Sequence, residues 1–301
     1  MGWRGDCSAA PARRAMFSGM KTPEIVTTVA TLRERIGLWR RGGARVGLVP
    51  TMGALHDGHL SLVRETQSRA DRSVASIFVN PAQFAPHEDF DRYPRDLASD
   101  AEKLGSVGLD LVFAPSVAEM YPQGFATKIE VGGPAQGLET DFRPHFFAGV
   151  ATVVAKLLIA AMPDVAIFGE KDYQQLLVIR RLTVDLGLPI EILGGPIIRE
   201  ADGLAMSSRN AYLTPEQRKI AGRLNIVLRD AITRLKHGDP VAVAEQFGRS
   251  DLLEAGFDSV DYVAIRDAAT LETIESLDRP ARILAAAKIG GTRLIDNMAV
   301  N

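Results

Sequence analysis

The sequence predicts an α/β protein, in which a Rossmann-like, doubly wound parallel sheet is followed by a smaller α+β domain. Three observations lead to this fold class. Short apolar runs alternate with helical patterns up to about residue 197, polar residues follow several of those runs directly, and the pattern changes beyond Ile198. Because parallel strands present their carboxyl ends at one edge of a sheet, we expect a ligand crevice at that edge.

The composition is that of an ordinary globular protein. The chain has 301 residues, of which 46% are hydrophobic and 24% charged, enough for one large or two modest domains. A net charge of -2 with few aromatic residues argues against nucleic-acid binding, and no apolar run is long enough to span a membrane. The single cysteine, Cys7, excludes an intrachain disulfide framework. We therefore expect a cytoplasmic protein without nucleic-acid or membrane partners.

The chain divides into three predicted segments. Residues 1–19 contain arginines, small residues and a proline but no apolar stretch of signal-peptide length, which indicates a disordered arm or a start upstream of Met20. Residues 20–197 form the predicted Rossmann-like domain, and residues 198–301 form the smaller domain.

The first elements lead to a turn rich in small residues. Apolar residues at helical spacing predict a helix over 22–39, and a buried strand follows at 46–49. A helix is expected over 60–69, with Asp57 as its N-cap. Gly53 and Gly58 allow the tight backbone that this turn requires.

This strand, turn and helix start predict a phosphate site. Free N–H groups and the positive end of the helix dipole attract an anion, and His56 and His59 are spaced to point toward it. The helix start favours neutral imidazole and a bound triphosphate favours imidazolium, so we expect a proton donor that responds to nucleotide binding. From spacing alone, two alternatives stay open: zinc ligands, or capping histidines without chemistry.

A second polar site is expected after the next strand, at 73–79. Asn80 and Gln83 follow it on a loop, where their amides could bind hydroxyls or a carboxylate; for Asn80 a turn cap is the alternative. The mixed-charge run at 87–96 is interpreted as solvated surface. Further elements of the sheet domain are predicted in this order: a helix at 96–105, a strand at 109–114, an edge strand at 127–131, a helix at 149–162, a strand at 165–168, a helix at 176–186 and a strand at 189–193.

The smaller domain begins with a polar loop at 206–210. Thr214 and Gln217 then form a capping box with proline at the first helical position. Its elements are predicted as helices at 215–236 and 241–254 and strands at 260–266, 282–288 and 292–298. The chain lacks GxGxxG, which argues against a dinucleotide site of the usual dehydrogenase kind.

Four motifs in order resemble the pantothenate synthetase family. They are PTMGALHDGH at 50–59, FVNPAQF at 78–84, GEKDYQQL at 169–176 and READGLAMSSRN at 199–210. The resemblance runs from about Thr22 to the LIDN sequence at 294–297. The HxGH element alone would indicate only the wider nucleotidyltransferase superfamily.

The resemblance implies an ATP- and Mg²⁺-dependent ligase that condenses pantoate with β-alanine. Pantoate would form a pantoyl adenylate with loss of pyrophosphate, and the β-alanine amine would then displace AMP. The first domain would bind ATP and pantoate, the second would cover the site, and the protein would be a homodimer. Another nucleotidyltransferase and a non-catalytic nucleotide-binding module are the alternatives.

The resemblance also implies roles for individual residues. His59 would act as proton donor, and the other groups neutralising phosphate charge would be His56, Lys171, Ser207, Ser208 and Arg209. The nucleotide site would comprise Met52, Gly53, Ala54, Leu55, His56, Asp57, Gly58, His59, Gly169, Glu170, Lys171, Asp172, Ile198, Met206, Ser207, Ser208 and Arg209. The acyl-substrate pocket would comprise Gln83, Gln175, Asn80, Tyr93 and Arg143. Asp100 matches a magnesium-facing position; a surface helix residue is the alternative.

One departure from the family pattern concerns a histidine. Relatives often read Arg-Pro-x-His-Phe, whereas this chain carries His145 one place early and Phe146 at the usual histidine position. We expect Phe146 to replace a packing residue. In the alternative, the histidine of relatives contacts the substrate. The pocket of this chain is then either altered or filled by His145, which would turn into it.

Overall fold

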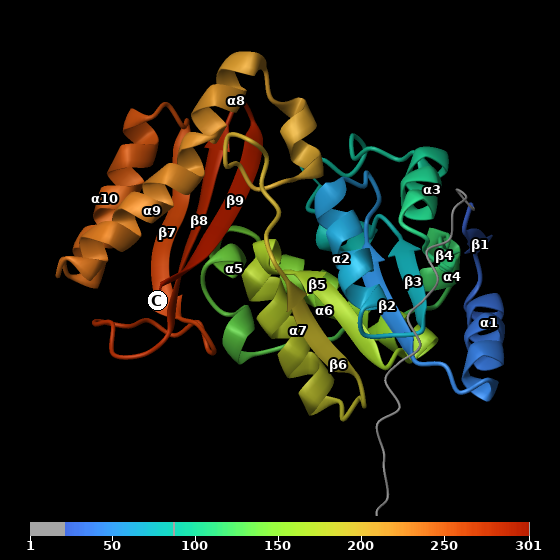
Figure 1. Ribbon diagram of the computed structural model, residues 1–301. Coiled ribbons are helices and arrows are strands. Elements are labelled where there is room, and N and C mark those ends of the chain that lie inside the picture. The colour runs from blue at the N-terminus through green and yellow to red at the C-terminus, as the bar shows by residue number, and fades with distance from the viewer. Residues whose placement is uncertain (1–21, 87, 301) are drawn as a thin grey trace, which may run out of the picture.

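The computed structural model describes residues 22–86 and 88–300, and the predicted arm at 1–19 lies outside the described residues. Two sheets lie side by side (Figure 1), which confirms the predicted fold class. The first sheet has six parallel strands in the order β1-β4-β3-β2-β5-β6. Its strands are β1 (Glu24–Val26), β2 (Val46–Thr51), β3 (Arg72–Ile77), β4 (Leu111–Phe113), β5 (Val165–Gly169) and β6 (Glu191–Gly195).

Helices cover both faces of the parallel sheet because its buried strands present apolar side chains in both directions. One face packs against α1 (Val29–Arg41), α6 (Phe146–Ala161) and α7 (Tyr173–Asp185). The other face packs against α2 (Asp57–Gln67) and α3 (Leu97–Ser106). Two short helices, α4 (Val117–Met120) and α5 (Glu139–Phe142), lie in the connections, together with the 3-10 turns η1 (Pro81–Gln83), η2 (Gly133–Ala135), η3 (Glu170–Asp172) and η4 (Ser208–Tyr212).

The second sheet is antiparallel, with the order β7-β8-β9. Its strands are β7 (Ser259–Asp267), β8 (Ala281–Ile289) and β9 (Thr292–Val300). One face packs against α9 (Arg223–Lys236) and α10 (Val241–Glu254), with α8 (Pro215–Ala221) beside them. On the other face, Ala264 and Leu284 join the apolar cluster of the first sheet. The middle strand is therefore buried on both faces and ties the two halves of the molecule together.

Several sequence predictions were wrong in detail. The helix expected over 22–39 starts only at Val29, because the preceding residues form β1 and pair with β4 at the sheet edge; β1 is thus a strand that the sequence pattern did not predict. The edge strand expected at 127–131 is absent from the described residues, and there the Ile129 N–H donates to Thr152 Oγ1 on α6 instead. The helix expected over 215–236 is divided at Gly222, whose carbonyl accepts from the Asn225 amide.

Candidate active site

A cavity of about 670 Å³ opens at the carboxyl edge of the parallel sheet, where the crevice was predicted. The ends of β2 and β5 form its floor, and β8 and β9 of the second sheet contribute the opposite wall. This volume lies within the range of pockets that enclose a small-molecule ligand. The predicted site residues that line it are Met52, His56, Gly58, His59, Asn80, Gln83, Tyr93, Arg143, Gly169, Lys171, Asp172, Gln175, Ile198, Met206, Ser207, Ser208 and Arg209.

The remaining predicted residues do not line this cavity. Gly53, Ala54, Glu170 and Asp100 are absent from its lining. Leu55 and Asp57 instead border a second cavity of about 340 Å³, to which His56 and Ser207 also contribute.

The turn after β2 has a special backbone. Gly53 and Ala54 both have positive φ, 85° and 51°, a conformation that is costly for the alanine. The Asp100 carboxylate accepts hydrogen bonds from the backbone N–H groups of Ala54 (2.9 Å) and Leu55 (2.8 Å) and so holds the turn from α3. The turn then delivers His56 to the start of α2.

His56, rather than Asp57 as predicted, is the N-cap of α2. Its Nδ1 accepts from the Gly58 N–H at 3.2 Å, and its own N–H donates to His59 Nδ1 at 3.4 Å. A nitrogen that accepts carries no proton, so both neutral rings hold their proton on Nε2. His56 therefore caps the helix, and the same hydrogen bonds leave Nε2–H as the donor of each ring.

The electrostatics keep both imidazoles neutral. Burial and then the Lys171 ammonium lower the pKa of His56 to about 4. Burial, His56 and Lys171 lower the pKa of His59 to about 3. A Cβ at Gly58 would lie 2.9 Å from the His56 ring, so glycine at this position lets the cap form. At neutral pH this helix start therefore offers uncharged N–H donors to an anion.

Further groups for the predicted phosphate site come from two loops. Lys171 lies on η3, directly after β5, with its ammonium 4.0 Å from the Asp172 carboxylate. Ser207 caps η4 by accepting from the Arg209 N–H, and the Arg209 guanidinium makes two 2.9 Å hydrogen bonds to Asp89. The structure thus brings the side chains predicted to neutralise phosphate charge to one cavity: His56, His59, Lys171, Ser207, Ser208 and Arg209.

The two amides after β3 support each other. Asn80 caps η1 by accepting a hydrogen bond from the Ala82 N–H. This cap is the alternative that the sequence left open for Asn80. Its Nδ2 donates to Gln83 Oε1 at 3.1 Å, and Gln83 Nε2 donates to Met52 Sδ at 2.9 Å. Gln83, which is 7% exposed, is therefore held in one orientation at the cavity wall.

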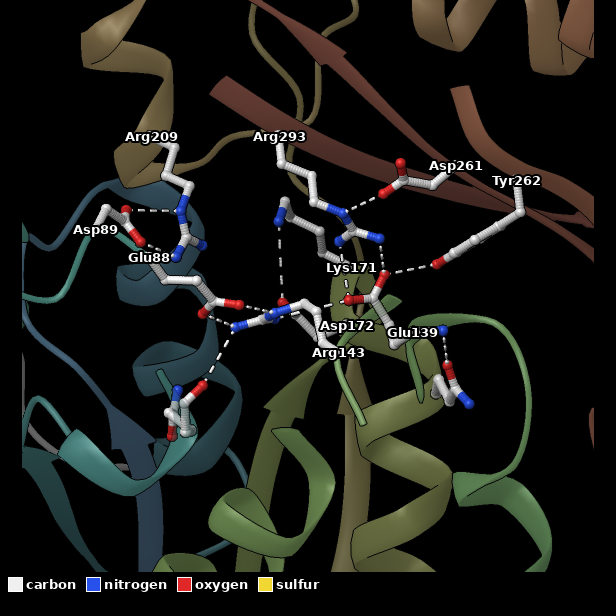
Figure 2. Close-up of polar contacts among 12 residues, drawn as sticks. Glu88, Asp89, Glu139, Arg143, Lys171, Asp172, Arg209, Asp261, Tyr262 and Arg293 are labelled. Atoms are coloured by element: carbon white, nitrogen blue, oxygen red, sulfur yellow. Dashed lines mark hydrogen bonds and ion pairs between the residues drawn. The ribbon is translucent and has the colours of Figure 1, made fainter. Parts of the chain in front are cut away.

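A network of ion pairs crosses the cavity between the two sheets (Figure 2). Arg143 binds the Glu88 carboxylate through two hydrogen bonds of 2.6 and 2.8 Å. Glu139 accepts from Arg293 at 2.7 and 2.9 Å and from the Tyr262 hydroxyl at 2.8 Å. Burial, and then the Glu139 charge, raise the pKa of the Tyr262 phenol well above its usual value, so it stays a donor.

The sequence interpretation missed most of this network. The run at 87–96 was assigned to solvated surface, which is wrong for three of its side chains: Glu88 pairs with Arg143, Asp89 pairs with Arg209, and Tyr93 is 5% exposed with its hydroxyl 3.0 Å from Ser208 Oγ. A mixed-charge run gave no local sign of partners elsewhere in the chain.

Asp100, the predicted magnesium-facing residue, has its carboxylate engaged by the protein in this structure. Both of its carboxylate oxygens accept backbone N–H groups, and its neighbour Ser99 supplies no second carboxylate. Among the described residues, no group of three or more His, Cys, Asp or Glu side chains is arranged to hold a metal ion. The alternative, a surface residue of the helix, is wrong because Asp100 is 2% exposed. The contacts of Asp100 instead fit a residue that shapes the turn.

Phe146, at the position where relatives often carry histidine, packs as expected and also borders the cavity. It belongs to the main apolar cluster, and the Arg143 guanidinium lies 3.9 Å from its ring centroid. A cation over an aromatic face is attracted by the ring quadrupole. In this chain the aromatic ring thus helps to orient Arg143.

Fold and site together define an α/β enzyme whose anion-binding pocket lies at the carboxyl edge of a parallel sheet. Residues 24–299 match the sequence family described as pantoate-beta-alanine ligase. The pantothenate synthetase of Mesorhizobium japonicum is 57% identical over 281 residues, 93% of this chain and 99% of the relative.

Solved structures agree. The chain is similar to the pantothenate synthetase of Thermus thermophilus, with 48% identity, a TM-score of 0.86 and coverage of 92% and 99% of the two chains. It is also similar to the Francisella tularensis pantoate-beta-alanine ligase, a complex with beta-gamma ATP and beta-alanine, with 33% identity, a TM-score of 0.78 and coverage of 92% and 97%. The chain belongs to the pantoate-beta-alanine ligase family, and it is a ligase of pantothenate biosynthesis.

Proposed function

We propose that the cavity joins (R)-pantoate to β-alanine in two steps. The pantoate carboxylate attacks the α-phosphate of ATP, which gives pantoyl adenylate and releases pyrophosphate. The β-alanine amine then attacks the acyl carbon and releases AMP. The observation that carries this proposal is the meeting, in one cavity, of a histidine-capped helix start with the Gln83 and Gln175 amides.

ATP is proposed to lie with its phosphates against the start of α2. The neutral Nε2–H groups of His56 and His59 would donate to phosphate oxygens, and Lys171 would neutralise the charge that develops as pyrophosphate leaves. Ser207, Ser208 and Arg209 would hold the far side of the nucleotide. The Francisella relative, solved with beta-gamma ATP and beta-alanine, supports these ligands.

The remaining residues of the proposed nucleotide site act through the backbone. Residues 52–55 form the turn that delivers His56, while Asp57 and Gly58 form the first turn of α2. Gly169 and Glu170 lead into Lys171, and Asp172 follows it. Ile198 and Met206 are joined by a hydrogen bond from the Met206 N–H to the Ile198 carbonyl, which sets the course of the chain into η4.

Pantoate is proposed to bind beside this site through neutral amides. Gln83 and Gln175 can both give and accept hydrogen bonds, which suits a substrate bearing hydroxyls and a carboxylate. Asn80 would act by holding Gln83, and Arg143 and Tyr93 would close the pocket from the loops. Because Arg143 is already paired with Glu88, it would attract a carboxylate less strongly than a free arginine.

Magnesium is proposed to arrive with ATP, bound to the phosphates, as is usual for this ion at nucleotide sites. Asp100 as a metal ligand stays a prediction with little geometric support, since its oxygens already hold the Ala54–Leu55 turn. The test measures how the adenylation rate depends on the Mg²⁺ concentration, in wild type and in an Asp100 variant. The same dependence in both proteins would support the proposal that Mg²⁺ is delivered with ATP.

The larger organisation is also proposed. The division at 197/198, with residues 20–197 binding ATP and pantoate and 198–301 covering them, is supported by a separate sheet in each part and by one apolar cluster formed only by residues of the second part. A homodimer follows from the family resemblance and can be tested by light scattering. No helix in the described part of the chain is long and apolar enough to cross a membrane. A cytoplasmic location is proposed from the need for ATP and can be tested by cell fractionation.

The decisive experiment measures AMP and pyrophosphate release from ATP and Mg²⁺, with pantoate and β-alanine supplied singly and together. We expect one burst of pyrophosphate with pantoate alone, and continuous AMP formation only with both substrates. A Lys171→Ala variant should lose the burst, whereas the matched Lys236→Ala variant, on the exposed end of α9, should keep it. ATP turnover that ignores both substrates would overturn the proposal.

A further inference from the structure

The LIDN sequence at 294–297 ends in a buried asparagine that touches the loop carrying Lys171. Asn297, on β9, is 2% exposed. Its Nδ2 group donates to two successive backbone carbonyls, those of Glu170 (2.9 Å) and Lys171 (2.8 Å). The side-chain amide of Asn297 therefore donates both of its hydrogens to the main chain of η3, the turn that follows β5 of the first sheet.

The asparagine is itself held on both sides. Its Oδ1 accepts from Arg282 Nε at 2.6 Å, and Arg282 also reaches Glu170 Oε2 at 3.0 Å. Its backbone N–H donates to the Asp296 carboxylate, which Arg199 binds through two hydrogen bonds of 2.6 and 2.9 Å. The Arg282 guanidinium lies 3.8 Å from the centroid of the Tyr173 ring at the start of α7. Neither the amide nor its neighbours can turn without breaking several of these contacts.

This arrangement fixes the backbone from which Lys171 extends. The η3 turn directly follows β5. Its N-cap residue is Gly169, which has no side chain to hold the turn. Both hydrogen bonds are partly buried, and a carbonyl that loses its donor there costs free energy, so the loop is held at the position where Asn297 satisfies both carbonyls. A displacement of about 1 Å at a reacting group can slow a reaction by about two orders of magnitude.

We propose that Asn297 is a positioning residue, through which the C-terminal sheet sets the reach of Lys171 into the cavity. It acts on the backbone of the lysine and does not contact substrate, because its amide hydrogens and its oxygen already have protein partners. The inference rests on the role of Lys171 given under Proposed function. If Asn297 acts in this way, the second sheet contributes to the adenylation step in addition to covering the site.

The test compares Asn297 with a matched asparagine. Asn225, also buried, donates through its Nδ2 to the Asp202 and Gly222 carbonyls and lies outside the cavity lining. We expect Asn297→Ala to slow single-turnover pyrophosphate release about 10- to 100-fold, with little change in the KM for β-alanine. Asn225→Ala should lower the melting temperature to a similar extent and leave that rate unchanged. If both variants lose the same activity, general destabilisation explains the result and the proposal is wrong.

A second variant separates donation from pairing with Arg282. Asn297→Asp keeps the oxygen that accepts from Arg282 but removes both donors, so it should be as slow as Asn297→Ala. A wild-type rate for Asn297→Asp would overturn the proposal. This near-isosteric variant also gives an answer if the alanine variant does not fold.

A double-mutant cycle distinguishes this inference from the proposed role of Lys171. If Asn297 acts through the lysine, Asn297→Ala should add little to the loss already caused by Lys171→Ala. Losses that multiply would show that Asn297 acts independently and would reject the positioning role. Full activity of Lys171→Ala itself would instead remove Lys171 from the chemistry, whatever Asn297 does.

Discussion

The two ends of the cavity handle charge in opposite ways. At the start of α2, His56 and His59 are neutral, and they present N–H donors together with the positive end of a helix dipole. At the end nearer the second sheet, charged groups pair with one another: Arg143 and Arg293 both bind protein carboxylates, and Glu139 joins them.

The difference indicates how two anionic substrates could be kept apart. A triphosphate can bind the helix start without displacing an internal ion pair, because its donors carry no net charge. A carboxylate at the other end meets arginines that are already engaged, so neutral amides such as Gln83 are better placed to select it. At the paired end, the Glu139–Arg293 ion pair joins the first part of the chain to the second sheet.

The largest expected effect concerns the neutral donors. His59→Ala should slow pyrophosphate release from ATP and pantoate by about two to four orders of magnitude, the usual scale for loss of a positioned donor or acid. His59→Gln, which can place an N–H near the position of Nε2, should recover part of that rate. Turnover close to wild type in the alanine variant would remove His59 from the chemistry.

The next effect tests what shapes the neutral end. Asp100→Asn replaces one acceptor by an amide that faces a backbone N–H, so the turn should shift and adenylation should slow about 10- to 100-fold. The Mg²⁺ concentration for half-maximal rate should stay unchanged. Rescue by excess Mg²⁺ would instead identify Asp100 as a metal-facing residue.

A smaller effect is expected at the paired end. Gln83→Ala removes one amide that is held by Asn80 and should raise the KM for pantoate about tenfold, while the KM for ATP stays the same. Steady-state kinetics with each substrate varied in turn would measure both constants. An unchanged pantoate dependence would contradict the pocket assignment, and equal changes in both constants would contradict the separation of the two ends.

The last effect is on stability rather than on a rate or a KM. The unfolded chain protonates its histidines near pH 6.5, whereas in the folded protein His59 takes a proton only near pH 3 and His56 near pH 4. Between those values the unfolded state binds more protons, so stability should fall as the pH drops below about 6.5. Between pH 7 and pH 5, the free energy of unfolding measured with urea should fall by about 2 kcal/mol less in His59→Gln than in wild type. Identical slopes would show that His59 is not held neutral.

Much of this protein could be predicted locally. Apolar periodicity located most helices and strands, and the capping box at Thr214 and Gln217 was confirmed. The strand, turn and helix start around His56 were also found from neighbouring residues, because strand pattern and helix capping depend on side chains only a few positions apart. The N-cap itself was misassigned, since both His56 and Asp57 could accept from the first N–H groups of α2.

The sequence by itself thus determined the fold class, the family resemblance and the strand, turn and helix start that carry His56 and His59. Only the tertiary structure decided how charge is paired at the other end and what Asp100 and Asn297 hold. Glu139 and Arg293 lie 154 positions apart, and Asn297 binds a carbonyl 127 positions away. Such contacts leave no periodic trace in the sequence, because they depend on which strands and loops the packed core brings to the same edge of a sheet.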